Sequence, residues 1–499
     1  MLFAVNQRSR CIVFCMHKSN NFSQVSPLGP IDVAVSVYVV GVAPGFHVPY
    51  EGLDPLVRDA FPDGFLPAYG SGLAFKGKDS DGAVEFWCLT DRGPNGEGPA
   101  APSPDGAGHM ASKLFPAPGF SPSIGVLRLA GGAAQLVARM PIRLTGGAPA
   151  SGLPIPHGAL GSSDEAPLSD RMRSGTDGTS LFDAGGIDTE AIAFDPERNA
   201  LWVTDEYGPF LIRLDAASAI MQERYAPGAG LPAVLALRRA NRGMEGMTLD
   251  PSSGRIHAFL QSPLSDGTTH YAVTGKDENV ERYARFLRWI EFDPAAGSTT
   301  RMLAYPLDGD AYAGGRTGNV KLGDLVALGG GKFVVIEQGE GAGGAMINNL
   351  MLVQIGSATN ILDEQWNPAT SDLERSSMAG EAVRGADWSG VTPLTKTLLL
   401  NLNSLGWVAE KAEGLAIVDE CTLAMTNDND FGLKTRLFDA RGDEREDADV
   451  TGLKVDAEGN IVQGGKPGDT VRIARGDEQE RPLTLWQLRF ARPLASYGE

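Results

Sequence analysis

Residues 188–213 read DTEAIAFDPERNALWVTDEYGPFLIR and contain the pattern of a β-hairpin with acidic residues at its open end. Two short apolar runs flank the sequence DPERN at 195–199, in which Asp, Pro and Asn favour a tight turn. Glu190 precedes the first run, and Asp205 and Glu206 follow the second. In an antiparallel hairpin, the start of the first strand lies beside the end of the second. Glu190 and Asp205 are therefore predicted to be neighbours.

The same hairpin pattern recurs along the chain. Each copy has an opening residue, an apolar run, a turn, a second apolar run and a closing polar residue. The copies open at Gly72, Glu190, Glu245, Asp324 and Glu413, and they close at Asp91, Asp205, Gln261, Glu337 and Asp428. Repeated strand pairs separated by long loops are typical of a β-propeller. Together with a weaker hairpin pattern at 450–461, they predict an all-β protein, a β-propeller of six or seven blades with long loop insertions.

The acids of these hairpins are candidate metal ligands. A propeller places the innermost strand of each blade around a central channel, so equivalent strand ends meet at one rim of that channel. Carboxylates brought together there repel one another, and a divalent cation relieves the repulsion. Oxygen ligands favour Ca²⁺, which takes roughly six to eight of them, over Zn²⁺, which prefers nitrogen and sulfur. The predicted Ca²⁺ ligands are the opening acids Glu190, Glu245, Asp324 and Glu413 and the closing acids Asp91 and Asp428.

Charge and composition exclude several partners and chemistries from the main expectation. The net charge of −19 argues against nucleic acid or an anionic membrane surface, because both attract basic proteins. The four cysteines do not form a disulfide framework, and the six histidines show no HExxH pattern. A zinc enzyme is therefore not expected. The 63 glycines and 32 prolines suit a fold with many tight turns and few long helices.

The two ends of the chain carry separate expectations. Residues 1–45 are predicted to be an N-terminal extension, disordered or a degenerate export signal, before a propeller domain at 46–499. The apolar stretch 33–42 is too short for a transmembrane helix, which needs about 20 residues. It fits either the hydrophobic part of a signal peptide, if translation starts at Met16, or an outer β-strand. The segment 483–490 is predicted to pair with the N-terminal region and close the ring.

Several motifs, taken in this order, resemble the phytase-like family, whose domain is described as an esterase-like activity of phytase. They are GSGLAF at 70–75, TDRGPNGEG at 90–98, KLFPAPGFSPSI at 113–124, GIDTEAIAFDP at 186–196, LWVTDEYGPF at 201–210, NRGMEGMTLDP at 241–251 and EGLAIV at 413–418. The resemblance covers about 68–432 and implies a phosphoester-cleaving activity carried by Glu and Asp residues. It also implies an exported protein, extracellular or periplasmic. Ala191 stands where the family usually has Gly.

A phosphate-ester site also needs cations that reach the rim. Arginine is favoured because its planar guanidinium binds two phosphate oxygens at once. The predicted catalytic residues are Arg92, Arg242, Asp205 and Glu206, and Lys321 and Lys411 are further candidates for binding phosphate. Ca²⁺ at the rim would polarise the phosphoryl group and activate a water molecule. The predicted function is a metal-dependent phosphoesterase that acts on a small phosphate ester.

Two other functions fit the same residues. The rim acids can instead pair with Arg92 and Arg242, which would give a non-catalytic propeller that binds a ligand or partner and holds a structural calcium. A lactonase-like hydrolase would use the carboxylate ligands but would not need two arginines. In each case the expected protein is a monomer with no nucleic acid partner and no integral membrane segment.

Overall fold

Five β-sheet blades arranged in a ring form the body of the protein. The computed structural model describes residues 17–176, 179–265, 271–272, 281–378, 390–446 and 448–498. Blade one contains β3 (Gly72–Lys78), β4 (Val84–Leu89), β7 (Ser123–Ala130) and β8 (Ala133–Pro141). Blade two contains β12 (Thr189–Asp195), β13 (Ala200–Asp205), β14 (Phe210–Asp215) and β15 (Met221–Pro227). Blade three contains β17 (Met244–Asp250), β18 (Arg255–Leu260), β21 (Phe286–Asp293) and β22 (Ser298–Pro306). Blade four contains β23 (Lys321–Gly329), β24 (Lys332–Glu340), β25 (Met346–Gln354) and β26 (Thr395–Asn401).

Blade five combines the two ends of the chain. It contains β27 (Ala412–Asp419), β28 (Thr422–Asn427), β33 (Thr484–Phe490) and β2 (Gly29–Gly41), and β1 (His17–Ser26) pairs with the outer side of β2. The antiparallel pairing of β2 with β33 confirms the predicted closure of the ring by 483–490. A short parallel pairing of β2 with β8 then links blade five to blade one.

The described part of the N-terminal region is therefore not separate from the propeller. The stretch 33–42 was expected to be either part of a signal peptide or an outer strand, and it lies mostly within β2. Val33 and Val35 are buried there in the core between blades four and five, which ties the strand to the ring. Met16 and the residues before it lie outside the described residues.

Apolar clusters between the blades hold the ring together. The inner strands β3, β12, β17, β23 and β27 contact one another in that order, and β27 returns to β3. Each neighbouring pair of blades shares one buried cluster: Ile124 with Ile192, Trp202 with Met247, Phe259 with Phe333, Val334 with Leu423, and Leu73 with Ala424. The five shared clusters close a ring of five blades.

The propeller fold is confirmed, but the predicted count of six or seven blades is wrong for the described chain. The hairpin pattern at 450–461 does not form a blade. Its strands β30 (Lys454–Val455) and β31 (Ile461–Gln463) join a small separate sheet, because β30 pairs with Ala100 of β5 (Gly96–Pro102) rather than with a blade. Each of the five strong hairpins supplies the inner two strands of one blade.

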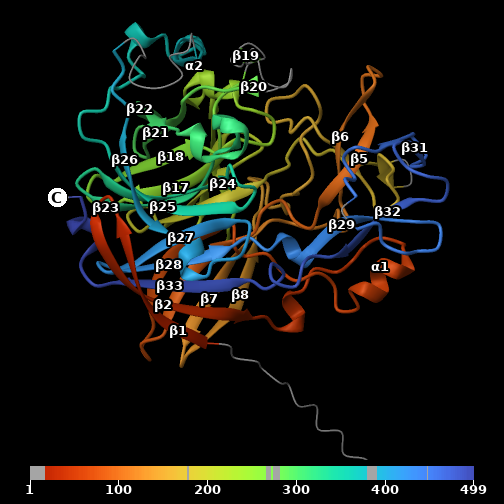
Figure 1. Cartoon of the computed structure of the whole chain (residues 1–499), viewed down its shortest axis with the longest axis horizontal. Coiled ribbons are helices and arrows are strands. Elements are labelled where there is room, and N and C mark those ends of the chain that lie inside the picture. The colour runs from red at the N-terminus through yellow and green to blue at the C-terminus, as the bar shows by residue number, and fades with distance from the viewer. Residues whose placement is uncertain are drawn as a thin grey trace, which may run out of the picture.

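Long insertions build the small sheet at one side of the propeller, to the right in Figure 1. It contains β5, β6 (His109–Leu114), β9 (Ala166–Leu168), β30 and β31, and the pair β29 (Leu433–Phe438) and β32 (Thr470–Arg475) packs beside it. The short helix α1 (Pro55–Ala60) shares its apolar core, and α2 (Asp372–Met378) covers blade three. The remaining short strands are β10 (Gly175–Thr176), β11 (Thr179–Ser180), β16 (Gly230–Leu231), β19 (Tyr271–Ala272) and β20 (Glu281–Arg282).

Candidate functional site

The inner strands of four blades begin with the same irregularity. In β12, β17, β23 and β27, a step of three residues on the inner strand matches a step of two on the second strand, which is a β-bulge. Bulges redirect side chains and are frequent beside functional sites. The first residues of these bulges are Glu190, Glu245, Gly323 and Glu413. Three of the predicted opening acids thus occupy equivalent positions around the channel.

Asp324 lies one residue further along its strand than the three glutamates. Its side chain is buried and accepts hydrogen bonds from the backbone amides of Met247 (3.2 Å), Leu325 (2.8 Å) and Leu415 (3.1 Å). The amide of Leu73 also donates to it. These amides belong to four different blades. The contacts of Asp324 are therefore those of a residue that joins the inner strands, and it does not line the cavity described below.

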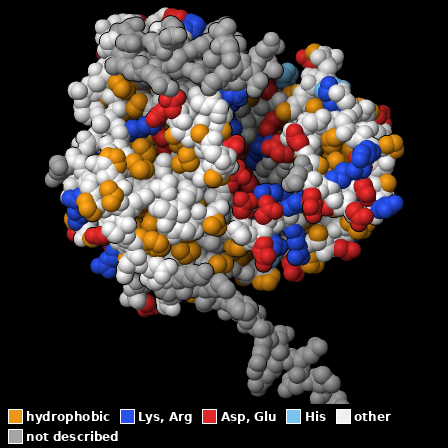
Figure 2. Space-filling model, viewed as in Figure 1, with side chains coloured by type: hydrophobic (Ala, Val, Ile, Leu, Met, Phe, Trp, Pro, Cys, Tyr) orange, Lys and Arg blue, Asp and Glu red, His pale blue; other side chains and the backbone are white. Residues whose placement is uncertain are grey.

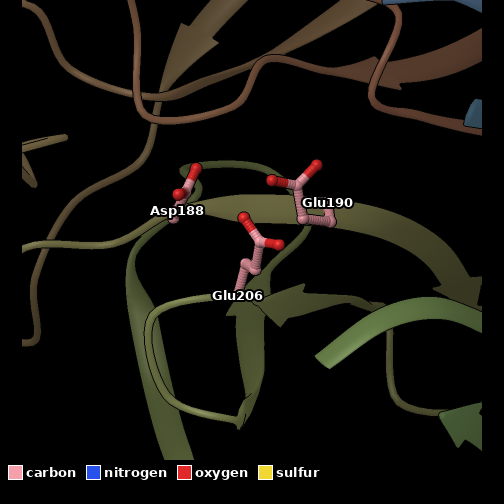
Figure 3. Close-up of side chains that lie close together, drawn as sticks. All are labelled: Asp188, Glu190 and Glu206. Atoms are coloured by element: carbon pink, nitrogen blue, oxygen red, sulfur yellow. The ribbon is translucent and has the colours of Figure 1, made fainter. Parts of the chain in front are cut away.

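Three carboxylates of blade two converge on one point. Asp188 precedes β12, Glu190 lies within it, and Glu206 follows β13. One oxygen from each lies within 4.8 Å of the other two, and the three side chains point into a common space in Figure 3. Oxygens around a single Ca²⁺ lie about 2.3–2.6 Å from it, so they can be up to about 5 Å apart. This carboxylate cluster (Asp188, Glu190 and Glu206) could hold a metal ion.

Two of the three carboxylates in the cluster have no protein partner in the described chain. Glu190 and Glu206 are 9% and 6% exposed, and neither carboxylate has a hydrogen bond or ion pair to another described residue. Burial and the neighbouring Asp188 raise the pKa of Glu206 to about 7. Burial, and then Glu245 and Asp188, raise the pKa of Glu190 well above its usual value. A bound cation would remove the electrostatic cost that these shifts express.

Asp205 supports the cluster from behind. Its Oδ1 accepts hydrogen bonds from the backbone amides of Asp188 (3.1 Å) and of Tyr207 (2.9 Å), the residue after Glu206. The residue is fully buried, and burial raises its pKa to about 7. Asp205 also pairs with Thr189 across the hairpin, so the predicted neighbourhood of the two hairpin ends is confirmed. Its position is suited to fixing Asp188 and Glu206 rather than to touching a ligand.

The two predicted arginines have different surroundings. Arg92 is buried, and its guanidinium pairs with Glu165 (3.1 Å) and Asp188 (3.6 Å). Arg242 is half-buried and donates to the side-chain oxygen of Gln261, but it has no ion pair within the described chain. Gln261 in turn donates to Glu245 (3.0 Å). Arg242 is thus the arginine with charge left for a ligand.

A second group of acids at the rim surrounds one lysine of blade five. Lys411 pairs with Asp428 (2.6 Å) and Asp430 (2.7 Å), and burial with the neighbouring Asp428 raises the pKa of Asp91 well above its usual value. Burial also raises the pKa of Glu413, although Lys411 opposes the effect. Lys411 therefore lies beside the acids of blade five, whereas Glu190 and Glu206 of blade two have no ion pair in the described chain.

Most of these groups line a cavity of about 1060 Å³ between the channel rim and the small sheet. Figure 2 shows acidic and basic side chains gathered around this hollow. The predicted site residues that line it are Asp91, Arg92, Glu190, Glu206, Arg242, Glu413 and Asp428. Asp205, Glu245 and Asp324 are not part of its lining.

Sequence reasoning did not select Asp188, Glu165 or Gln261 as site residues. Asp188 stands two residues before Glu190, and this alternation along an extended chain is the one signal that could have identified it. Glu165 lies in a long loop far from any hairpin, so its pairing with Arg92 follows only from the fold. In the part of the chain that the structure describes, none of the helices is long and apolar enough to cross a membrane.

A comparison with protein families supports the resemblance over residues 135–431. A family model named phytase-like, and described as an esterase-like activity of phytase, matches residues 135–431. No curated protein matches the sequence. Among solved structures, the α-L-arabinofuranosidase of Podospora anserina in complex with cellotriose is 9% identical, with a TM-score of 0.32 over 86% of this chain and 96% of that chain. The PQQ-bound aldose sugar dehydrogenase of Streptomyces coelicolor is 12% identical, with a TM-score of 0.25 over 81% of this chain and 98% of that chain.

Proposed function

The chain belongs to the phytase-like family, and we propose that it is a metal-dependent phosphoesterase that acts on a small phosphate ester in the rim cavity. The observation that carries the proposal is the carboxylate cluster. Two of its three buried acids have no partner among the described residues, and they face a cavity whose wall also carries an arginine without an ion pair. The cluster supplies a place for a cation, and Arg242 supplies a place for an anion.

Ca²⁺ is the proposed ion, held by Asp188, Glu190 and Glu206, because the donors are all carboxylate oxygens with the spacing that this ion accepts. When bound, it supplies a positive charge that polarises a phosphoryl oxygen and lowers the pKa of water. Arg242 can donate two parallel hydrogen bonds to the phosphoryl group, which fixes the orientation of the ester. Asp205 keeps the backbone of Asp188 in place, and Arg92 fixes the carboxylate of Asp188 from the other side.

Glu206 serves in this proposal as a ligand of the cation and not as the group that accepts a proton. Burial and Asp188 raise its pKa to about 7 in the metal-free chain. A bound cation would lower that pKa and keep Glu206 in the carboxylate form that binds the metal.

A second candidate function is hydrolysis of a neutral ester or lactone at the same cluster. The pairing of Arg92 with Glu165 and Asp188 favours it, because one of the two predicted phosphate arginines is already neutralised. A lactone would need the carboxylate-bound cation but not Arg242. A non-catalytic propeller that uses the cavity to bind a ligand is the remaining alternative, with the metal in a structural role.

Turnover of three substrates separates these functions. Phosphate release from phytate and from an aryl phosphate, and hydrolysis of a simple lactone, would be measured with added Ca²⁺ and with a chelator. The variants are Glu206→Gln in the cluster and, as a matched control, Glu97→Gln, since Glu97 also lines the cavity but pairs with Lys113. Ca²⁺-dependent phosphate release that Glu206→Gln loses and Glu97→Gln keeps would support the phosphoesterase. Lactone hydrolysis alone would support the second candidate, and no turnover would leave a binding function.

A further inference from the structure

One lysine on the cavity wall carries a charge that no described residue balances. Lys321 begins β23 and lines the cavity. Its ammonium group has no hydrogen bond or ion pair to any residue that the structure describes. The other lysines of the wall are paired: Lys113 with Glu97, Lys411 with Asp428 and Asp430, and Lys434 with Asp477 and Glu480. An unpaired ammonium on a cavity wall attracts an anionic ligand.

The position of Lys321 can be compared between blades through the strand register. The residue two positions before the first bulge residue of the inner strand lies opposite a residue at or near the end of the second strand. We call these two residues the rim pair of a blade. The rim pairs are Asp188 and Glu206 in blade two, Gly243 and Gln261 in blade three, Lys321 and Gln338 in blade four, and Lys411 and Asp428 in blade five.

These rim pairs differ in charge. The pair of blade five is an ion pair and is neutral. The pair of blade two has two acids and needs a cation. The pair of blade four has one cation and needs an anion, because the side-chain oxygen of Gln338 already accepts from Asn348 (2.9 Å) and from the amide of Ala412 (2.8 Å). Blades two and four therefore carry opposite excess charges around a single cavity.

The surroundings of Lys321 strengthen its need for an anion. Burial, and then the neighbouring cations Arg242 and Lys411, lower the pKa of Lys321, while Glu410 and Glu206 oppose this effect. Arg242 stands on the same side of the rim and uses one donor on Gln261. A guanidinium has five donors, so Arg242 retains others for a ligand. Lys321 and Arg242 thus both face the cavity, and neither has an ion pair within the described chain.

We propose that Lys321 and Arg242 form a subsite for a tetrahedral oxyanion, the phosphoryl or sulfate class, and that Lys321 takes up a proton when the subsite fills. The subsite rests on the proposed function in that it would hold the phosphoryl group opposite the carboxylate cluster. Its existence does not depend on hydrolysis, however, because binding alone reveals it. The bound dianion offsets the repulsion between the two cations and stabilises the protonated form of Lys321.

Calorimetric titration with sulfate tests both parts of the proposal. Sulfate remains a dianion across the working pH range, so any proton taken up on binding must protonate a group of the protein. The titrations would be made at about pH 9, below the ordinary lysine pKa of about 10.4. Two buffers with different heats of ionisation would be used, with Ca²⁺ present. The expected result for the wild type is sulfate binding with net proton uptake.

Three variants distinguish the outcomes. Lys321→Met is expected to weaken sulfate binding about tenfold or more, as for the loss of a charge-assisted hydrogen bond. Lys321→Arg is expected to bind sulfate within a few-fold of wild type but without proton uptake, because arginine does not deprotonate. Lys434→Met is the control, since Lys434 also lines the cavity but is paired with two acids. It is expected to bind sulfate as the wild type does.

Two results would overturn the proposal. Unchanged sulfate binding by Lys321→Met would mean that Lys321 is not part of an oxyanion subsite. Proton uptake that persists in Lys321→Arg would place the proton on the carboxylates rather than on Lys321. Circular dichroism of each variant checks that it is folded, and Lys321→Arg keeps the test decisive if Lys321→Met does not fold. Sulfate binding without any ester hydrolysis would contradict the phosphoesterase and leave the subsite standing.

Discussion

Asp188 and Lys321 occupy equivalent positions in two blades. Asp188 precedes Thr189, which pairs with Asp205, and Lys321 precedes Leu322, which pairs with Glu337. One repeated structural position therefore carries an acid in blade two and a base in blade four. Repetition of the blade provides the scaffold, and substitution at one position of the repeat provides opposite charges facing one cavity. That division of charge is what a site for a cation and an oxyanion requires.

The stability of the metal-free protein is expected to fall as pH rises. Burial raises the pKa values of Asp205 and Glu206 to about 7 in the folded chain, and an unfolded carboxyl has a pKa of about 4. Such a group stabilises the fold fully below its unfolded pKa, and this stability is lost as pH rises through the folded pKa. In a chelator, the melting temperature should therefore decrease between about pH 4 and about pH 7 and level off towards about pH 8.

Added Ca²⁺ is expected to reverse that trend, because the cation binds the deprotonated cluster and competes with protons. The increase in melting temperature caused by Ca²⁺ should be larger at about pH 8 than at about pH 6. A melting temperature that rises with pH in the chelator would contradict the raised pKa values. The variant Glu206→Gln should show a weaker dependence on pH, since one of the titrating groups is gone.

Replacing Asp324 is expected to affect stability and not metal binding. Asp324→Ala leaves the buried amides of Leu73, Met247 and Leu415 without an acceptor. Each unsatisfied buried amide costs about 1–3 kcal/mol, so the free energy of unfolding should fall by about 3 kcal/mol or more. Denaturant unfolding measures this loss, and Asp324→Asn should lose less because it keeps one oxygen. A variant of unchanged stability that binds Ca²⁺ more weakly would instead make Asp324 a metal ligand.

The two arginines are expected to separate stability from ligand binding. Arg92→Met leaves Glu165 and Asp188 without their buried partner, which should cost about 3–5 kcal/mol of unfolding free energy. Arg242→Met removes a side chain with no ion pair in the described chain, so its unfolding free energy should change by less than about 1 kcal/mol. Sulfate affinity should fall in Arg242→Met. Equal loss of stability in both variants would argue against this difference in role.

Two valines of β2 test whether the N-terminal strand is part of the propeller. Val35 is buried between blades four and five, whereas Val39 is 41% exposed. Val35→Asn should lower the unfolding free energy by about 3 kcal/mol, because it removes apolar contacts and buries an amide. Val39→Asn should change it by about 0.5 kcal/mol or less. If the two variants had the same thermal stability, β2 would not be needed to close the ring.

The repeated hairpins were visible in the sequence because a strand–turn–strand pattern is local. The number of blades was not visible in the sequence. The pattern at 450–461 is locally similar to the blade hairpins, and only its pairing with Ala100 places it in the small sheet. The acids near the rim were identified by the same local pattern. The bulge itself was not predicted, because it arises from the register between two strands. Asp324 is the second residue of its bulge and directly precedes the apolar Leu325, whereas in the other three blades one small residue separates the glutamate from the next large apolar residue. Arg92 was likewise predicted to face a ligand, and its partner Glu165 lies 73 residues away.

Calcium binding by two matched glutamate variants separates the carboxylate cluster of blade two from the acids of blade five. Glu190 and Glu413 occupy equivalent bulge positions, but Glu190 belongs to the carboxylate cluster and Glu413 lies beside Lys411. Calorimetric titration of Ca²⁺ into wild type, Glu190→Gln and Glu413→Gln, each checked for folding, compares the two. We expect one Ca²⁺ site that Glu190→Gln loses and Glu413→Gln keeps. Loss of binding in Glu413→Gln alone, or no Ca²⁺ binding by the wild type, would contradict this expectation.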